Sequence, residues 1–216
     1  MNQAIAALVR RHDPDRFLTA LFAPPEKRDA LLTLYAFNHE LARAREVVSE
    51  PPLALIRLQW WREVVDGAHR RHEVAEPLLA AIDTGELDRG GLLALIDARE
   101  AEAEPGFETV QDWRAYLSRS AGGVAVTAGR LLGAPDPGAL RPLGTAYGIA
   151  GLLRSIPAHS RQGRCLLPLD VLTKHGLTPE GVIADPSAAA AYPVKSREPL
   201  QSMTRKPVDA QGITRR

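Results

Sequence analysis

The chain has 216 residues, 45% of them hydrophobic and 25% charged, and a formal net charge of +1. Such a balance is typical of a soluble globular protein with a sizeable core, and it gives no general attraction to nucleic acid. The one cysteine, Cys165, excludes an intrachain disulfide and favours a reducing compartment. No apolar run approaches the roughly 20 residues that span a bilayer. We therefore expect neither a transmembrane segment nor a nucleic-acid partner.

Apolar residues recur at helical spacing along most of the chain, and no alternating strand pattern persists. Asp13 and Pro14 predict the start of a short helix, as its N-cap and first residue. Residues 26–48 then carry apolar side chains three, four and seven positions apart, which is typical of one helix face. Later helices are predicted over 77–82, 92–99, 109–132, 137–156, 169–175 and 178–183. Thr109, with Asp112 three residues on, resembles a capping box and predicts the start of the third of these.

A further helix is predicted after Pro51-Pro52, because Ile56, Trp60 and Val64 repeat at four-residue steps. Trp60 and Trp61 are adjacent and must point to different faces of this helix. We expect one of them to lie in the core, with the other buried or available as a contact surface.

These patterns predict an all-α domain of packed, largely antiparallel helices over residues 1–184. Gly122 and Gly123 lie inside a predicted helix, where each costs about 1 kcal/mol relative to Ala. A close helix crossing explains them, and close approach of a ligand is the alternative. Residues 185–216 lose the apolar period, so we expect a tail of low order or of atypical sequence.

The most informative stretch is residues 147–164, where a helix ends in Leu152-Leu153-Arg154 and a loop of Arg and Gly follows. It resembles the second aspartate motif of the squalene/phytoene synthase family. The resemblance continues, in the family's order, through residues 15–37, 57–62, 116–124 and 163–168. It implies an isoprenoid-synthase-like helical bundle. Because such bundles continue for further helices, it also implies that this chain is truncated at its C-terminus.

In that family, aspartates on two facing helices hold Mg²⁺ against a substrate diphosphate. The resemblance places Ala42, Arg43 and Glu46 at the aspartate positions of the first motif. It places Ser155 and His159 at those of the second. One carboxylate is left, and imidazole suits softer metals than Mg²⁺. We therefore expect no catalytic residue, no metal site and no cofactor; Mg²⁺ is required only if the chain is an active synthase.

Six further side chains are candidates for lining the cavity or binding a ligand: Tyr35, Asn38, Tyr147, Arg154, Arg161 and Arg164. The arginines suit an anionic ligand, or they form ion pairs with Glu40 and Glu46 across the cavity. His159 is either a site residue or a histidine that the helix dipole favours at a helix C-terminus.

The replacements resemble one branch of the family, which assists the assembly of respiratory complex I. The resemblance is carried by residues 36–42, 48–50, 57–61 and 153–161. It implies a catalytically degraded protein whose partner is a complex I subunit or another assembly protein. It also implies a cytoplasmic location in a bacterium, at most peripheral to the inner membrane, or the mitochondrial matrix in a eukaryote.

Two alternatives stay open. One is a Mg²⁺-dependent prenyl transferase of the phytoene or squalene synthase type, acting in terpenoid biosynthesis. The other is a non-catalytic protein that keeps the cavity and binds an isoprenoid or another lipid.

Overall fold

A computed structural model describes residues 2–48 and 50–191. Within these ranges the regular structure is helical, apart from one isolated bridge between Phe107 and Pro168. The α-helices are α1 (Gln3–His12), α2 (Pro14–Ala20), α3 (Arg28–Glu46), α4 (Pro51–Val65), α5 (Ala75–Asp83), α6 (Arg89–Glu100), α7 (Val110–Arg119), α8 (Ala121–Leu131), α9 (Arg141–Arg154), α10 (Ile156–Arg161), α11 (Leu169–Lys174) and α12 (Pro179–Ala184). Short 3₁₀ helices are η1 (Pro25–Lys27), η2 (Ala101–Ala103), η3 (Pro137–Leu140) and η4 (Pro186–Ala191). The predicted all-α fold is confirmed.

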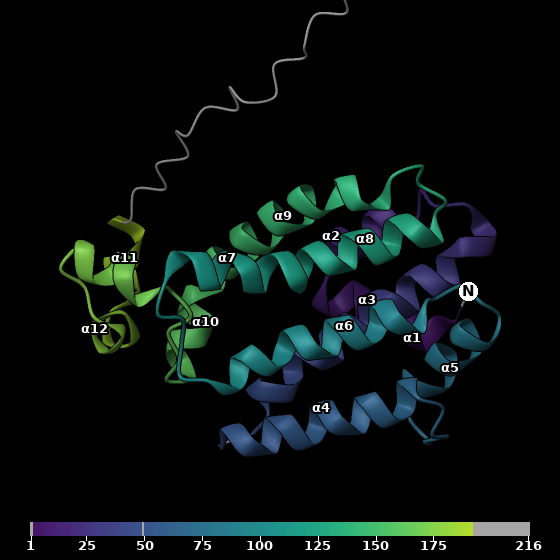
Figure 1. The fold of residues 1–216 in the computed structure, drawn as a ribbon, viewed down its shortest axis with the longest axis horizontal. Coiled ribbons are helices and arrows are strands. Elements are labelled where there is room, and N and C mark those ends of the chain that lie inside the picture. The colour runs from purple at the N-terminus through teal and green to yellow at the C-terminus, as the bar shows by residue number, and fades with distance from the viewer. Residues whose placement is uncertain (1, 49, 192–216) are drawn as a thin grey trace, which may run out of the picture.

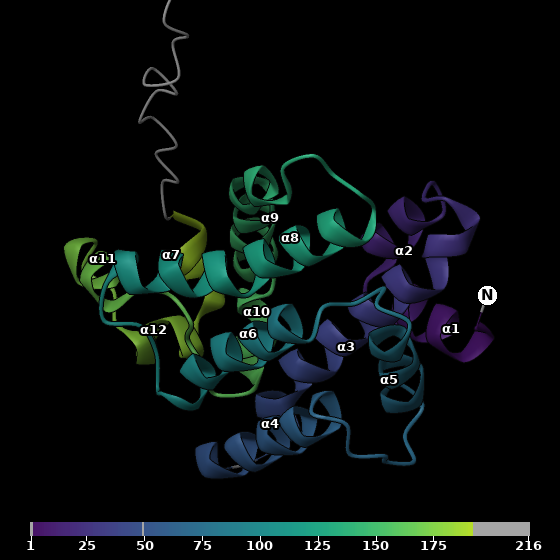
Figure 2. The same ribbon diagram turned by 45° about the vertical axis from the view of Figure 1, so that its right-hand side comes forward.

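The helices are arranged around α3, which packs against α1, α4, α5, α6 and α8. Figures 1 and 2 show α4 at one edge of the molecule and α9 at the opposite edge. The short helices α11 and α12 gather at one end of the bundle, away from α1 and α5. Of the predicted tail, η4 is described and buries Ala189, whereas residues 192–216 lie outside the described residues.

Two separate apolar clusters form the core. The larger joins α1, α3, α4, α5, α6 and α8 around fully buried side chains such as Phe37, Leu78 and Ile96. The smaller joins α7, α9, α11 and α12 around Leu172 and Val182. Since a close-packed interior leaves few voids within each cluster, the space for a site lies at the junction between them.

Several helix starts follow the sequence prediction. The Asp13 carboxylate accepts a hydrogen bond from the Arg16 amide at 3.1 Å and caps α2, with Pro14 as its first residue. Thr109 caps α7 by accepting from the Asp112 amide at 3.1 Å. The helix predicted over 26–48 is α3, which is shorter by two residues at each end.

The helix predicted over 109–132 is wrong as one element, because the chain breaks at Ser120. That residue has ψ −84°, and its hydroxyl donates to the Tyr116 carbonyl at 2.8 Å. Such local side-chain bonds compete with the helical ladder. The helix predicted over 137–156 also differs, since it begins as η3 and α9 ends at Arg154. The loop predicted after Arg154 is instead the six-residue helix α10.

Helix α4 forms as predicted, but the four-residue repeat does not mark its buried face. Ile56 is 64% exposed and Trp60 is half-buried, whereas Trp61 and Val64 are buried. The reason is geometric, because each four-residue step rotates about 40° around an α-helix. Ile56, at the start of the repeat, therefore lies outside the helix face that contacts α3 and α6.

The predicted close helix crossing at Gly122 is confirmed, since α8 and α9 pack tightly there. A Cβ on Gly122 would lie 3.0 Å from the Arg141 carbonyl oxygen. On the facing helix, a Cβ on Gly144 would lie 2.6 Å from the Ala125 Cβ and 2.7 Å from the Ala121 carbonyl oxygen.

Two glycines of α9 therefore predict opposite effects of the same change. Gly144→Ala places a methyl group against backbone, so the free energy of unfolding should fall by about 1–3 kcal/mol. Gly151→Ala meets nothing within 4 Å, so helix propensity should raise stability by about 0.5 kcal/mol. Urea unfolding of both variants measures this, and equal effects would contradict the packing at Gly144.

Candidate functional site

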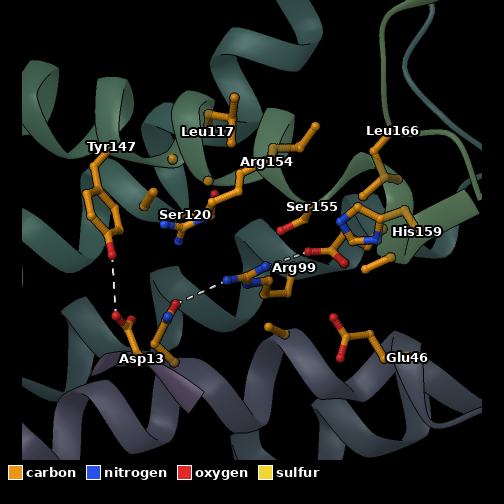
Figure 3. Close-up of a pocket in the computed structure, with 18 of the residues that line it drawn as sticks. Asp13, Glu46, Arg99, Leu117, Ser120, Tyr147, Arg154, Ser155, His159 and Leu166 are labelled. Carbon is orange, nitrogen blue, oxygen red and sulfur yellow. Dashed lines mark hydrogen bonds and ion pairs between the residues drawn. The ribbon is translucent and has the colours of Figure 1, made fainter. Parts of the chain in front are cut away.

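A cavity of about 300 Å³ opens at the junction of the two core clusters. Its walls come from α3, from the α7–α8 break, and from α9 and α10, with α2 at its mouth. Figure 3 shows Arg99 projecting into the middle, Glu46 below it on α3, and Ser155 and His159 opposite. The two faces that the family motifs occupy therefore do meet across one cavity.

Seven of the residues singled out from the sequence line this cavity: Asn38, Ala42, Glu46, Tyr147, Arg154, Ser155 and His159. Four others do not. Tyr35 packs against the larger cluster, and Arg43 turns away to Glu40. Arg161 is exposed. Arg164 is buried and lines a separate small cavity together with His159 and residues of the smaller cluster.

The centre of the cavity is held by the Arg99 network, which comprises Arg99, Glu102, Tyr116 and Asn38. The Arg99 guanidinium donates to Glu102 Oε1 at 2.6 Å, to the Tyr116 hydroxyl at 3.0 Å and to Asn38 Oδ1 at 3.1 Å. The Tyr116 hydroxyl in turn donates to Glu102 Oε1 at 2.5 Å. These short, charge-assisted bonds fix Arg99 in one position.

Burial and ion pairing oppose each other in this network, and pairing wins. Burial alone would raise the pKa of Glu102, but Arg99 and the Tyr116 hydroxyl outweigh it and hold that pKa below its ordinary value. Burial would lower the pKa of Arg99, yet Tyr116 and Glu102 raise it. Burial raises the pKa of Tyr116. The network is therefore an ionised Arg–Glu pair with a neutral phenol at neutral pH.

Ion pairs form around the cavity, but not with the predicted carboxylates. Arg164 lies 3.5 Å from Glu102 Oε2, and Arg154 lies 3.5 Å from Asp15 at the exposed rim. The sequence suggested Glu40 and Glu46 as the partners of these arginines. Glu40 instead pairs with Arg43 at 3.0 Å. The sequence correctly predicted that arginines form ion pairs at the cavity, but it named the wrong carboxylates, because Glu102 was not among the candidates.

Glu46 is left as a carboxylate in a poor environment for charge. Burial raises its pKa, and the nearby negative charge of Glu102 raises it further. Across the cavity, burial lowers the pKa of His159, with Arg164 acting in the same direction. Its Nδ1 atom is buried without a hydrogen-bond partner among the described residues. Both pKa shifts are therefore in the direction of the neutral form of the group.

These residues do not fit the magnesium cluster that the family resemblance implies. Mg²⁺ requires near-octahedral oxygen ligands, usually carboxylates. Here the motif positions that line the cavity offer the Ala42 methyl, the Ser155 hydroxyl, the His159 imidazole and one carboxylate, that of Glu46, while Glu102 is occupied by Arg99. In the part of the chain that the structure describes, no cluster of three or more His, Cys, Asp or Glu side chains could hold a metal ion.

The mouth of the cavity is closed in part by cation and ring contacts. The Arg16 guanidinium lies 4.6 Å from the centre of the Tyr147 ring, and the Tyr147 hydroxyl donates to Asp13 at 3.3 Å. His12 also lines the cavity, and its ring stacks on that of His39 at 4.2 Å. Burial lowers the pKa of His39 to about 4, with His12 as the next cause. The His39 imidazole is therefore uncharged at neutral pH.

Sequence reasoning missed Arg16, Arg99 and Glu102 as site residues. Arg99 and Glu102 are three positions apart, a spacing at which opposite charges meet on a helix. That signal was present, but the same spacing occurs on solvated helix surfaces. Tyr116 lay within a block that resembles the family, yet nothing in its spacing linked it to Arg99.

Glu102 predicts a pH-dependent loss of stability. Glu102→Gln leaves Arg99 and Arg164 buried without their carboxylate, so the free energy of unfolding at pH 7 should fall by about 3–5 kcal/mol. Because folding lowers the pKa of Glu102, its contribution is complete above the ordinary value of 4.5 and is lost as pH falls through the folded-state pKa. The gap between variant and wild type should therefore close in acid.

Urea unfolding across this pH range measures the gap. Glu104→Gln is the matched control, because Glu104 is exposed and close in sequence. Equal stability of the two variants at pH 7 would contradict the role given to the Arg99 network.

No helix among the described residues combines the length and the apolar character needed to cross a membrane.

Comparison with known proteins places this geometry in a family. The squalene/phytoene synthase family model matches residues 9–206. A dehydrosqualene synthase crystal structure with a bound ligand superposes with a TM-score of 0.67 at 18% identity, covering 81% of this chain and 63% of that one. The shared architecture confirms the isoprenoid-synthase fold.

Curated relatives include proteins of two kinds. NADH dehydrogenase (ubiquinone) complex I, assembly factor 6 from Bos taurus is 30% identical over 181 residues, which are 80% of this chain and 54% of the relative. The phytoene synthase of Rhodobacter capsulatus is 28% identical over 171 residues, which are 76% of this chain and 50% of the enzyme. The chain spans about half the length of these relatives. It belongs to the squalene/phytoene synthase family.

Proposed function

We propose that this protein assists the assembly of NADH dehydrogenase, respiratory complex I, and does not catalyse prenyl transfer. The main support for the absence of prenyl transfer is the position of the Arg99 guanidinium, which Glu102, Tyr116 and Asn38 fix at the centre of the cavity. Similarity to complex I assembly factor 6 over 80% of the chain supports the first part.

The loss of catalysis follows from electrostatics. Ionising a prenyl diphosphate requires dications that neutralise the leaving group. In this cavity the immobile Arg99–Glu102 pair takes the central position, and Glu46 is the one carboxylate that α3 contributes to the lining. A dication placed there would compete with Arg99 for the Glu102 carboxylate, and Glu46 alone does not supply the several oxygen ligands that Mg²⁺ requires. We therefore infer a protein without a metal cofactor.

Assembly factors act through protein contacts, so we propose a complex I subunit or a second assembly protein as the partner. The proposed location follows the partner: the cytoplasm of a bacterium, peripheral to the inner membrane, or the mitochondrial matrix of a eukaryote. These assignments depend on the similarity to the assembly factors.

Binding of an isoprenoid or another lipid is a second candidate, and one observation favours it. The cavity keeps about 300 Å³ although the metal ligands are replaced, a volume at the lower limit of small-molecule sites. A non-catalytic ligand in this space is compatible with an assembly role. Mass spectrometry of organic extracts from the purified protein tests it, and extracts without a stoichiometric lipid would remove this candidate.

Mg²⁺ should have no effect on the wild-type protein. Incubation with farnesyl or geranylgeranyl diphosphate and Mg²⁺ should release no diphosphate above background, and Mg²⁺ should not shift the melting temperature. The variant with Ala42→Asp, Ser155→Asp and His159→Asp places carboxylates at those resembled positions that line the cavity. Mg²⁺ should raise its melting temperature, because binding to the folded state stabilises it.

The outcome against this proposal is diphosphate release by the wild-type chain. Variants that carry a single one of these changes serve as controls, since one added carboxylate should leave the melting temperature insensitive to Mg²⁺.

Deletion of this chain should lower the amount of assembled NADH dehydrogenase. The measurement is in-gel activity of the complex and NADH oxidation by isolated membranes, each with re-expression of the chain as the control. Re-expression of the Glu104→Gln variant should restore both. Unimpaired assembly after deletion would contradict the assembly role.

A further inference from the structure

The outer face of α4 carries an apolar groove that is separate from the central cavity. It has a volume of about 300 Å³ and is lined by Glu40, Ile56, Arg57, Trp60, Trp61 and His72. Asn38 and Ala42 line the central cavity, and Glu40, two positions from each, lies on the opposite side of α3 because two residues rotate about 200°. Helix α4 stands at the edge of the molecule in Figures 1 and 2.

Aromatic side chains make the groove rigid. The Trp60 and Trp61 rings meet edge to face at 4.8 Å, and the His72 ring lies 5.5 Å from Trp60 and 5.2 Å from Trp61. The Val74 amide donates to His72 Nδ1 at 3.1 Å and fixes the imidazole. Rigid aromatic walls lose little entropy when a side chain enters between them.

An apolar stripe extends the groove along α4. Leu53 is 43% exposed and Ile56 is 64% exposed, and with Trp60 they follow the three- and four-residue spacing of one helix face. Single exposed apolar residues need no explanation, but a contiguous stripe beside a groove is typical of an interaction surface.

Charge decides which occupant fits. Glu40 is buried under the groove, and Arg43 already neutralises it at 3.0 Å. Arg57 is exposed at the rim and makes no ion pair with any described residue. By contrast, Arg62 on the same helix binds Asp97 at 2.7 Å and Glu100 at 2.8 Å. The groove therefore presents an uncompensated cation and suits a carboxylate.

We propose that this groove binds a segment of a partner protein in which an apolar side chain packs against Trp60 and His72 and a neighbouring carboxylate pairs with Arg57. An incoming Lys or Arg would meet Arg57 and a carboxylate that already has its counter-ion. The inference goes beyond the assembly role, on which it depends only for the identity of the partner.

Photo-crosslinking in cells that encode this chain tests the proposal. p-Benzoylphenylalanine replaces Leu53 at the end of the stripe, and the matched control position is Leu132, which is also 43% exposed but lies at the end of α8. Irradiation should attach the Leu53 probe to one protein, through a peptide with an apolar residue beside Asp or Glu. The Leu132 probe should not give this product.

Charge reversal then tests the ion pair. Arg57→Glu should lower the cross-link yield at least about tenfold, as expected for an interface residue that contributes strongly. Arg57→Gln should give a smaller loss, and both variants should melt like the wild type, because Arg57 is exposed. Changing the partner's acid to Lys should restore the yield with Arg57→Glu.

Three results would overturn the proposal: no Leu53 product, a product that Arg57→Glu leaves unchanged, or a product with lipid, with a basic segment or with a second copy of this chain. Failure of the assembly role is distinguishable. If deletion leaves NADH dehydrogenase assembly unimpaired while the Arg57-dependent product forms, the groove stands and the assembly role falls. If deletion impairs assembly and no product forms, the assembly role stands and the proposed groove interaction falls.

Discussion

The structure depends on keeping one buried guanidinium paired. Arg99 reaches into the junction of the two apolar clusters, where a lone charge would cost several kcal/mol in desolvation. Its partners come from three elements: Asn38 on α3, Glu102 on η2 and Tyr116 on α7. Because Asn38 is on a helix of the larger cluster and Tyr116 belongs to the smaller one, the pairing of Arg99 also ties the clusters together.

The same pairing controls the chemistry of the cavity. Glu102 is the best-placed acid for a cation, yet Arg99 and Arg164 both lie against it. Burial raises the pKa of Glu46, and the negative charge of Glu102 raises it further. Burial lowers the pKa of His159, and the positive charge of Arg164 acts in the same direction. The pKa shifts of Glu46 and His159 are both in the direction of the neutral form, and the ion pairs of Glu102 occupy its carboxylate. None of these features adds an oxygen ligand for a dication.

Local signals predicted much of the fold. Asp13 and Thr109 are short-range caps, whose physics lies within three residues, and the sequence placed both correctly. The break at Ser120 was not predictable, because a Ser in a helical pattern is ordinary and the bond from its hydroxyl to the Tyr116 carbonyl has no sequence signature. Helix α10 was missed for a related reason, since Pro157 and the following polar residues read as a loop without tertiary contacts.

The residues of the site also divide into those that the sequence could predict and those that it could not. Residues tied to a family motif, such as Asn38, Ser155 and His159, could be placed in the cavity from the resemblance. The Arg99–Glu102 pair could not, because an i,i+3 pair has the same sequence signature whether it is buried or solvated. Burial at the junction, which only the three-dimensional packing supplies, changes that pair from a minor surface contact into the central charge of the cavity.

The two faces of α4 extend this reasoning from the interior to the surface. Leu58 and Trp61 are buried and fasten the helix to the bundle, and Arg62 is tied to α6 by ion pairs. Ile56 and Arg57 share the same short stretch of sequence but have no comparable structural partner among the described residues. The ion pairs of the cavity occupy Glu102, and this occupation is the basis of our proposal that the protein performs no metal-dependent chemistry there. We propose the outer face of α4 as the partner-binding surface, because an apolar groove and the charge of Arg57, unpaired among the described residues, lie side by side there.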